Sequence, residues 1–424
     1  METYAIALSY AIPGFIVLVA IESLLSRWMG MRVNEHMDTI SSLSSGVTNT
    51  LKSLMGLTVV IISYEWMVGQ FAVFNIQSSV ALYVLAFIGL DFAGYWSHRF
   101  NHVVNLFWNR HIIHHSSEEF NLSCALRQSI SAIVGIYFFL YIPMAIIGIP
   151  THVIAVIAPI HFFAQFWYHT RLINKMGWLE YIIVTPSHHR VHHAINPQYI
   201  DKNFSEIFII WDKLFGTFQA ELKEVPPVYG ITKPVNTWNP ILINYMHLWQ
   251  LSKDAWRTQK WWDKLRIWFM PTGWRPTDVI EQYPLEYTKD PYTREKYKTE
   301  SSIALIVWSW SQLTVSLLFM YYMLVNIANF QFIGIVLFAL FLMLSIFAYT
   351  TLMDGHRFAL PAEIIKLATG LLLLYQMNEW APISEVLPAM STLLSIYLLV
   401  SLLVTVYFVV FELRTRRDNV SVSA

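Results

Sequence analysis

Histidines are concentrated in four short segments of this 424-residue chain, which contains fifteen of them in total. The segments are "HRFNH" (His98, His102), "HIIHH" (His111, His114, His115), "QFWYH" (His169) and "HRVHH" (His189, His192, His193). Residues three or four positions apart share one helix face, so three of these segments can each direct two imidazoles to one point. Imidazole binds iron, zinc and copper, and the spacing therefore predicts a metal site.

The number of histidines indicates how many metal ions the site holds. A catalytic zinc ion takes three protein ligands and a structural one takes four, so nine histidines are too many for one ion and suit two. The H-E-x-x-H sequence of zinc proteases and the Glu-x-x-His pairs of soluble di-iron bundles are both absent. The single cysteine, Cys124, excludes a thiolate site. We therefore predict a pair of irons that activates dioxygen to attack an unactivated C–H bond.

Other polar residues near the histidines have predicted supporting roles. Asp91 lies seven residues before His98, and we expect it to accept a hydrogen bond from a liganding imidazole; the alternative is a structural partner for a buried Tyr or Trp. His161 could be an outer ligand, because it lies eight residues before His169. Glu118 and Glu119 are expected to be solvated loop carboxylates, and the alternative is that they orient histidines. The isolated histidines are expected to be ordinary residues: His36, His152, His247 and His356.

The composition places these histidines in a membrane protein. Hydrophobic residues make up 55% of the chain and charged residues 13%, against about 25% charged residues in soluble domains. The formal net charge of zero argues against nucleic-acid binding. A bilayer core takes about 20 apolar residues as helix. Segments of this kind lie near 4–25, 53–73, 79–98, 130–149, 152–169, 303–327, 331–351, 360–377 and 388–412.

These segments predict an all-α integral membrane protein with roughly nine transmembrane helices. Every second link between these segments lacks Lys and Arg, and the other links carry them. Because cytosolic links are rich in Lys and Arg, the histidines and the C-terminus are predicted to lie in the cytosol. The predicted catalytic domain covers 1–300 and includes a histidine-rich cytosolic helical cap at about 170–302. Residues 301–424 form a predicted C-terminal helical bundle. The membrane would be the endoplasmic reticulum in a eukaryote and the inner membrane in a bacterium.

One stretch of the cap combines tryptophan with basic residues. Residues 244–270 contain Trp249, Trp256, Trp261, Trp262 and Trp268 among five Lys and Arg residues. This combination is typical of a helix that lies in the membrane interface. An amphipathic helix that caps the protein's own core is the alternative.

The depth of the histidines indicates a class of substrate. A helix that enters the membrane near Ser79 reaches the cytosolic boundary around His98 after about 20 residues. A lipid whose reactive carbon lies near its polar end would reach such a site. Alkyl glycerols, sterol ring carbons and carbon two of a fatty acyl chain all satisfy this condition.

The three boxes "HRFNH", "HIIHH" and "HRVHH" resemble those of the fatty acid hydroxylase and sterol desaturase superfamily of membrane di-iron enzymes. Its alkylglycerol monooxygenase branch is more similar still, through "HHSSEEFNLSCALRQS", "TPSHHRVHH" and "DKNFSEIFIIWDKLFGTF". The resemblance implies tetrahydrobiopterin as reductant and hydroxylation of the ether-bearing carbon, which releases a fatty aldehyde and glycerol. It implies His188 as an essential neighbour or an alternate ligand and, as iron ligands, His98, His102, His111, His114, His115, His169, His189, His192 and His193.

The chain departs from this pattern at one position and lacks a redox domain of its own. Val103 stands in "HVVN" where the branch has glutamate. No G-x-G-x-x-G motif opens a helix after a strand, so a pterin or an electron-transfer protein must supply the electrons. The alternatives are a sterol or fatty acyl hydroxylase or desaturase with the same site and, more remotely, a histidine-lined metal transporter. The sequence leaves the oligomeric state open.

Overall fold

The computed structural model describes residues 2–380 and 390–413. Their secondary structure is helical, apart from four isolated β-bridges. This confirms the predicted all-α class for the described part of the chain.

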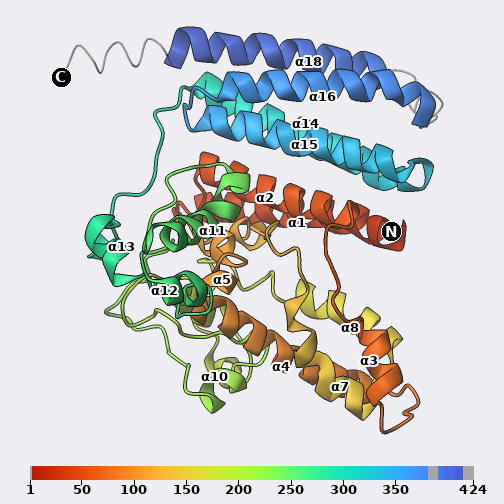
Figure 1. Cartoon of the computed structure of the whole chain (residues 1–424), viewed down its shortest axis with the longest axis vertical. Coiled ribbons are helices and arrows are strands. Elements are labelled where there is room, and N and C mark those ends of the chain that lie inside the picture. Colours follow the sequence, from red (N-terminus) through yellow and green to blue (C-terminus); the bar gives the residue numbers. More distant parts are fainter. Residues whose placement is uncertain (1, 381–389, 414–424) are drawn as a thin grey trace.

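Six long helices form the upper half of the molecule in Figure 1. They are α1 (Glu2–Trp28), α2 (His36–Leu54), α14 (Ile303–Val325), α15 (Phe332–Met353), α16 (Ala359–Trp380) and α18 (Met390–Tyr407), which a π-turn extends over Phe408–Glu412. Helix α15 packs between α14 and α16, α18 covers α16, and α2 packs against both α14 and α15. Their apolar side chains form the largest buried core of the described residues.

A second group of helices forms the lower half. Helix α4 (Val80–Val103) packs against α8 (Thr151–Phe163), and α3 (Tyr64–Phe71) packs against α7 (Ile142–Ile147), which follows the 3-10 turn Ile136–Tyr141. A smaller apolar cluster joins α4, α7 and α8. The C-terminal end of α4 points toward the polar part of the chain (Figure 1).

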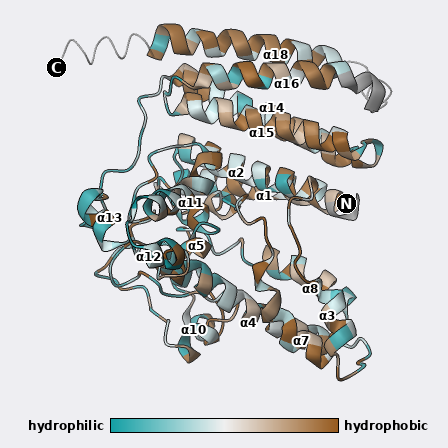
Figure 2. Ribbon diagram, viewed as in Figure 1, coloured by the Kyte–Doolittle hydropathy of each residue, from teal (hydrophilic) through white to brown (hydrophobic). Residues whose placement is uncertain are grey.

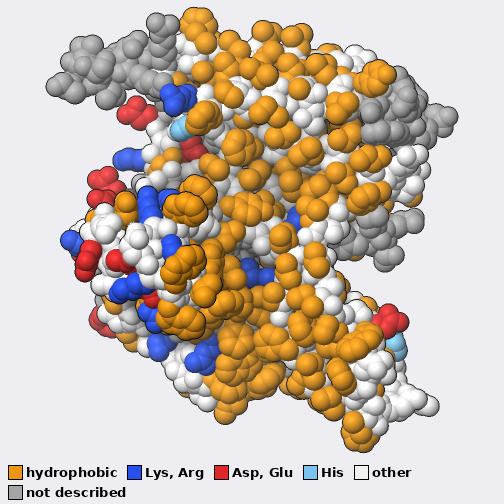
Figure 3. Space-filling view, in the orientation of Figure 1, with side chains coloured by type: hydrophobic (Ala, Val, Ile, Leu, Met, Phe, Trp, Pro, Cys, Tyr) orange, Lys and Arg blue, Asp and Glu red, His pale blue; other side chains and the backbone are white. Residues whose placement is uncertain are grey.

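Five of the described helices are long and apolar enough to cross a membrane. They are Ala5–Trp28, Val80–Val103, Ile303–Val325, Phe332–Met353 and Ser391–Glu412. Figure 2 shows hydrophobic residues along these helices, and Figure 3 shows a broad hydrophobic face over them. The protein is thus suited to a membrane, as its composition predicts.

Three of the nine predicted segments are not single long helices. In 53–73, α2 ends at Leu54, and Gly56 follows with a left-handed φ of 65° before the short α3 begins. In 130–149, only Ile136–Ile147 forms a short apolar helix, which ends at the left-handed Gly148. In 152–169, α8 stops at Phe163. Apolar length alone conceals these breaks, of which the first contains the left-handed Gly56, whereas the other two segments lack helix at 130–135 and 164–169.

The polar part of the chain gathers at one end of the long helices, where Lys and Arg side chains cluster (Figure 3). Its short helices are α5 (Asn105–Trp108), α6 (Ile112–His115), Cys124–Leu126, Gly177–Tyr181, α9 (Pro186–His192), α10 (Ile210–Leu214), α11 (Pro240–Arg257), α12 (Trp261–Arg266), α13 (Thr277–Gln282) and Pro291–Thr293.

The tryptophan-rich stretch 244–270 packs on the protein core, while its place in a membrane interface stays a prediction. Helix α11 packs on α2 and α6 and buries Ile243 and Leu251. Trp256 and Trp261 point away from that contact, with 86% and 78% of their surface exposed. One face therefore caps the protein core, while the exposed indoles are suited to a membrane interface.

Candidate metal centre

The nine predicted histidines come together in two groups with no shared member. The five-histidine group consists of His98, His102, His111, His115 and His192. The four-histidine group consists of His114, His169, His189 and His193. Within each group, one nitrogen of every imidazole lies within 4.8 Å of the others. Two groups of four or five nitrogen donors suit two metal ions.

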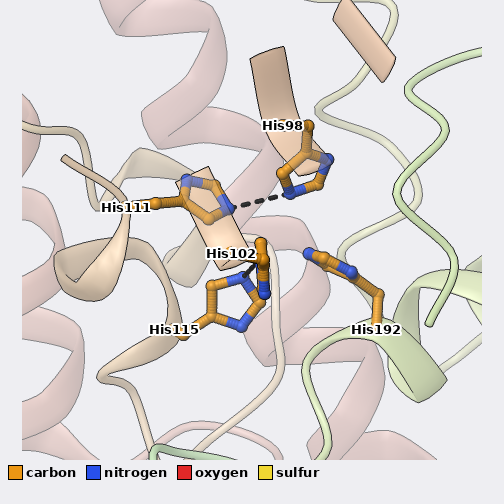
Figure 4. Close-up of side chains that lie close together, drawn as sticks. All are labelled: His98, His102, His111, His115 and His192. Atoms are coloured by element: carbon orange, nitrogen blue, oxygen red, sulfur yellow. Dashed lines mark hydrogen bonds between the residues drawn. The ribbon is translucent and has the colours of Figure 1, made fainter. Parts of the chain in front are cut away.

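The five-histidine group lies where α4, α6 and α9 converge (Figure 4). Helix α4 contributes His98 and His102 from adjacent turns of one face. The Nε2 atoms of His98 and His111 are 2.8 Å apart, and those of His102 and His115 are 3.1 Å apart. The Nε2 atom of His192 is buried and has no hydrogen-bond partner in the described part of the chain. A buried nitrogen that faces other imidazole nitrogens fits a metal ligand.

The four-histidine group is built around His189 in α9. Its Nε2 lies 2.8 Å from Nε2 of His169 and 3.0 Å from Nε2 of His193. His114 Nε2 lies 3.3 Å from His169 Nε2. The two groups adjoin, because the rings of His115 and His193 stack with their centroids 4.3 Å apart.

Backbone carbonyls fix the orientation of several imidazoles. The carbonyl oxygens of Phe204, Lys202, Arg127 and Gln165 accept hydrogen bonds from the Nδ1 atoms of His98, His192, His114 and His169, at 2.8, 2.9, 3.3 and 3.0 Å. A proton on Nδ1 leaves the Nε2 lone pair free. Such bonds are the usual means by which proteins orient metal-binding histidines.

The surroundings also keep the imidazoles neutral. Burial, followed by the charges of neighbouring imidazoles, lowers the pKa of His189 and His192 well below the usual value. Burial lowers the pKa of His169 to about 3. Metal binding requires neutral imidazole, so the groups are prepared for a metal at neutral pH.

A buried arginine connects α2 to the segment 116–127, which follows the histidines of α6 and is called the histidine loop. Arg127 donates to Asp38 Oδ1 at 2.7 Å and to Ser42 Oγ at 2.9 Å, both on α2. It also donates to Ser116, the residue after His115, at 2.7 Å. The sequence analysis missed both this ion pair and helix α2, because the serine-rich α2 lacks a long apolar run.

Asp91 does not contact any of the nine histidines. Its carboxylate accepts hydrogen bonds from His161 Nε2, from the backbone N–H groups of Ile207 and Phe208, and from Trp211 Nε1, at 2.8 to 3.0 Å. The imidazole that it contacts is therefore His161, and the alternative of a buried Trp partner is also realised. These four donors occupy both carboxylate oxygens, which leaves Asp91 unsuited to binding a metal itself.

Glu206 is a site residue that the sequence analysis missed. Its Oε2 accepts a hydrogen bond from Gln165 Nε2 at 3.1 Å and lies 3.7 Å from His161 Nδ1. Burial raises its pKa to about 7. An isolated glutamate before the apolar run "IFII" carries no spacing signal that could have identified it.

His188 lies outside both groups, although its neighbour His189 is central to one of them. Its Nδ1 accepts a hydrogen bond from the Thr185 backbone N–H at 3.4 Å, which caps the start of α9. Its ring packs edge-on against Phe218. The contacts of His188 thus position α9.

Glu118 and Glu119 are not the free, solvated carboxylates that we expected. Glu118 pairs with Arg294, and Glu119 pairs with Arg171 and Lys296. Both carboxylates tie the histidine loop to other segments. His247 has an ordinary contact, with its Nε2 2.8 Å from the backbone oxygen of Asn105.

A cavity of about 570 Å³ reaches both histidine groups. Apolar residues of α1 and α14, among them Ile12, Phe15 and Leu317, form part of its wall. The remaining wall includes Gln165, Glu206 and five of the nine histidines: His98, His111, His114, His169 and His189. Pockets of about 300–1,000 Å³ are typical of small-molecule sites. We call this space the first cavity.

Comparison with known proteins gives one consistent result. The fatty acid hydroxylase family model matches residues 83–217. Alkylglycerol monooxygenase from Homo sapiens is 35% identical over 90% of this chain and 84% of its own length, and the Danio rerio protein is 32% identical over 96% and 90%. The ornithine lipid hydroxylase OlsE of Rhizobium tropici is 29% identical over 36% of this chain and 46% of its own. No solved structure matches this chain.

Proposed function

The chain belongs to the alkylglycerol monooxygenase family of membrane monooxygenases, and from this premise we propose that it hydroxylates the ether-bearing carbon of alkylglycerol lipids at a di-iron centre. The observation that carries the proposal is the pair of adjoining histidine groups beside a cavity with apolar walls. In this proposal all nine histidines are iron ligands, five to one iron and four to the other.

The first cavity is the proposed lipid site. Ile12, Phe15 and Leu317 belong to two of the candidate membrane spans, so a lipid tail can pass from the bilayer to the histidines without crossing water. Gln165 and Glu206 give the same cavity a hydrogen-bond donor and an acceptor for the hydroxyl groups of a glycerol.

The bound irons would supply the activation of dioxygen. In the overall reaction, one oxygen atom enters a C–H bond of the ether-bearing carbon and the other leaves as water, which consumes two electrons and two protons. The resulting hemiacetal breaks into a fatty aldehyde and glycerol. The chain's own residues hold the imidazoles neutral and oriented, and the buried site excludes bulk water.

Asp91 and His188 act as positioning residues in this proposal. Asp91 holds the segment 207–211 and His161, whereas His188 fixes the start of α9. The reductant is proposed to be tetrahydrobiopterin. Val103 occupies the position of the family's glutamate, so any contact with the pterin must come from other residues of this chain.

The proposed topology retains the cytosolic location of the site and a cytosolic cap over about 170–302. The nine apolar segments are proposed to enter the membrane, with the three short ones as partial crossings. Single cysteines introduced after Pro150 and after Asn329 should react only from the non-cytosolic side. The native Cys124 is buried and should not interfere. Labelling of both sites from the cytosol would reverse the proposed orientation.

The function can be tested by iron content and turnover. Protein purified without oxygen should contain close to two irons per chain and, with tetrahydrobiopterin, should convert an alkylglycerol into a fatty aldehyde. Oxidation of a sterol or fatty acyl lipid alone, with a ferredoxin or cytochrome donor, would refute the ether-lipid proposal. Purification with no bound iron and no recovery of activity when iron is added would refute the di-iron proposal.

A further inference from the structure

A second cavity, of about 270 Å³, reaches the histidines from another side. It touches His102, His115, His192 and His193, which are the four histidines that the first cavity does not touch. The first three belong to the five-histidine group and the fourth to the four-histidine group. Each cavity therefore reaches both proposed irons through its own set of imidazoles.

The walls of the second cavity differ from those of the first. Apart from His102 at the end of α4, its lining comes from segments outside the five candidate spans. One part of the wall is a hydrogen-bonded chain in which Lys233 donates to Gln250 at 3.2 Å, and Gln250 and Arg275 both donate to Asp254, at 2.9 and 2.6 Å. This part of the wall can hydrogen-bond a ligand, while apolar residues such as Ile231 and Leu251 line another part.

The same wall offers unused hydrogen-bonding capacity and flat surfaces. Thr272 Oγ1 is buried without a hydrogen-bond partner within residues 2–380 and 390–413. Lys233 has three ammonium hydrogens, and among the described residues Gln250 is the one acceptor for them. Trp108, Trp274 and Tyr287 also line the cavity. Donors beside aromatic faces suit a planar ring that carries carbonyl or nitrogen acceptors.

We propose that the second cavity binds the electron donor, and that this donor is a small, water-soluble reductant with a planar hydrogen-bonding ring. This inference rests on the proposed function, because it assigns the reductant of that reaction to a site. A tetrahydropterin has the required chemistry. It loses two electrons and two protons as it becomes a dihydropterin, and these complete the reduction of one oxygen atom to water while the other oxygen atom enters the lipid.

The volume favours a small molecule over a protein. A cavity of about 270 Å³ lies near the lower limit of small-molecule pockets, about 300 Å³. A donor at this site can reduce the centre while a lipid still fills the first cavity. Donor and lipid should therefore bind together without competition.

The test compares the same substitution in the two cavities. Lys233→Met removes a cation from the second cavity, and Lys52→Met removes one from the first. Binding of tetrahydrobiopterin to the iron-loaded, oxygen-free protein in detergent is measured by calorimetry. One hydrogen bond from a charged donor corresponds to about a tenfold change or more in Kd, so Lys233→Met should raise the pterin Kd by that factor and Lys52→Met should leave it unchanged.

Thr272→Val provides a second, gentler variant, which removes only the unpaired hydroxyl from the second cavity. It should weaken pterin binding while two irons per chain and the affinity for an alkylglycerol persist. A raised pterin Kd in Lys52→Met, together with an unchanged Kd in Lys233→Met and Thr272→Val, would place the donor in the first cavity and overturn the inference.

The inference and the proposed function can fail separately. Pterin binding that depends on Lys233, without any conversion of alkylglycerol, would support the site and refute the substrate. Conversion of alkylglycerol with an electron-transfer protein, in a chain that binds no pterin, would overturn the inference and leave the proposed function intact.

Discussion

Replacing Asp91 by asparagine tests how the segment behind the metal centre is held. Asp91 is fully buried, and each of its carboxylate oxygens accepts two hydrogen bonds. In asparagine, one of these oxygens becomes an amide NH2 group, which donates. Whichever way the amide is turned, at least one backbone N–H, that of Ile207 or of Phe208, loses its acceptor and faces another donor.

The cost follows from the number of bonds. A hydrogen bond to a charged group contributes about 1.5–3 kcal/mol and a neutral one about 0.5–1.5 kcal/mol. One bond is lost and the three others change from charged to neutral, so Asp91→Asn should destabilise the fold by about 4.5 to 7.5 kcal/mol. The loosened segment begins just after Phe204, whose carbonyl oxygen orients His98. Activity should therefore fall by about 10- to 100-fold, as is usual when the support of a metal ligand is lost.

Unfolding in detergent, followed by tryptophan fluorescence, should be measured together with iron content and turnover. Glu224→Gln is a suitable control, because it makes the same chemical change at an exposed carboxylate. The control should resemble the unaltered protein in all three measurements. If Asp91→Asn unfolds and turns over as the control does, the four hydrogen bonds do not support the centre.

Four further predictions concern individual side chains. His189→Ala leaves three histidines in its group and should lower the iron content from two to about one per chain and abolish turnover; two irons and full activity would exclude His189 from the site. His247→Ala should leave iron content unchanged, since His247 belongs to neither group, and an iron-free variant would show that the site extends further. Arg127→Met leaves the buried Asp38 without its cation and should lower the free energy of unfolding by about 3–5 kcal/mol. An unchanged free energy of unfolding would show that the ion pair makes no net contribution to stability. Glu206 has a folded-state pKa of about 7, above its unfolded value of 4.5. The unaltered protein should therefore lose stability relative to Glu206→Gln as the pH rises from about 5 to about 7. If the difference in free energy of unfolding between the two proteins does not change with pH, the raised pKa is contradicted.

Local sequence spacing was enough to predict which histidines come together. His98 and His102, or His189 and His193, are placed by helix periodicity alone, and the structure needs only to bring the segments into contact. The division into groups of five and four depends on how the segments meet in the fold, so that His114 and His115 belong to different groups although they are adjacent in sequence. No local pattern specifies that division.

Tertiary contacts explain the other differences. Asp91 has the helical position expected for a partner of His98, yet the segment 207–211 folds over it and supplies three donors, and His161 supplies a fourth. Long apolar runs predicted the five full-length spans well. They overestimated the helix near Gly56, where a left-handed glycine follows the end of α2 within an apolar stretch, and they also predicted helix over 130–135 and 164–169, which are not helical.

The wall of the first cavity crosses the predicted boundary between the catalytic part and the C-terminal bundle. Leu317 and Met320 of α14 line the same space as the histidines, opposite residues of α1. If this cavity receives the lipid tail, shortening the chain to its first 300 residues would leave the tail site open on one side. The later spans can then diverge in sequence among relatives and change which tail lengths and branches are accepted, while the chemistry at the histidines stays the same.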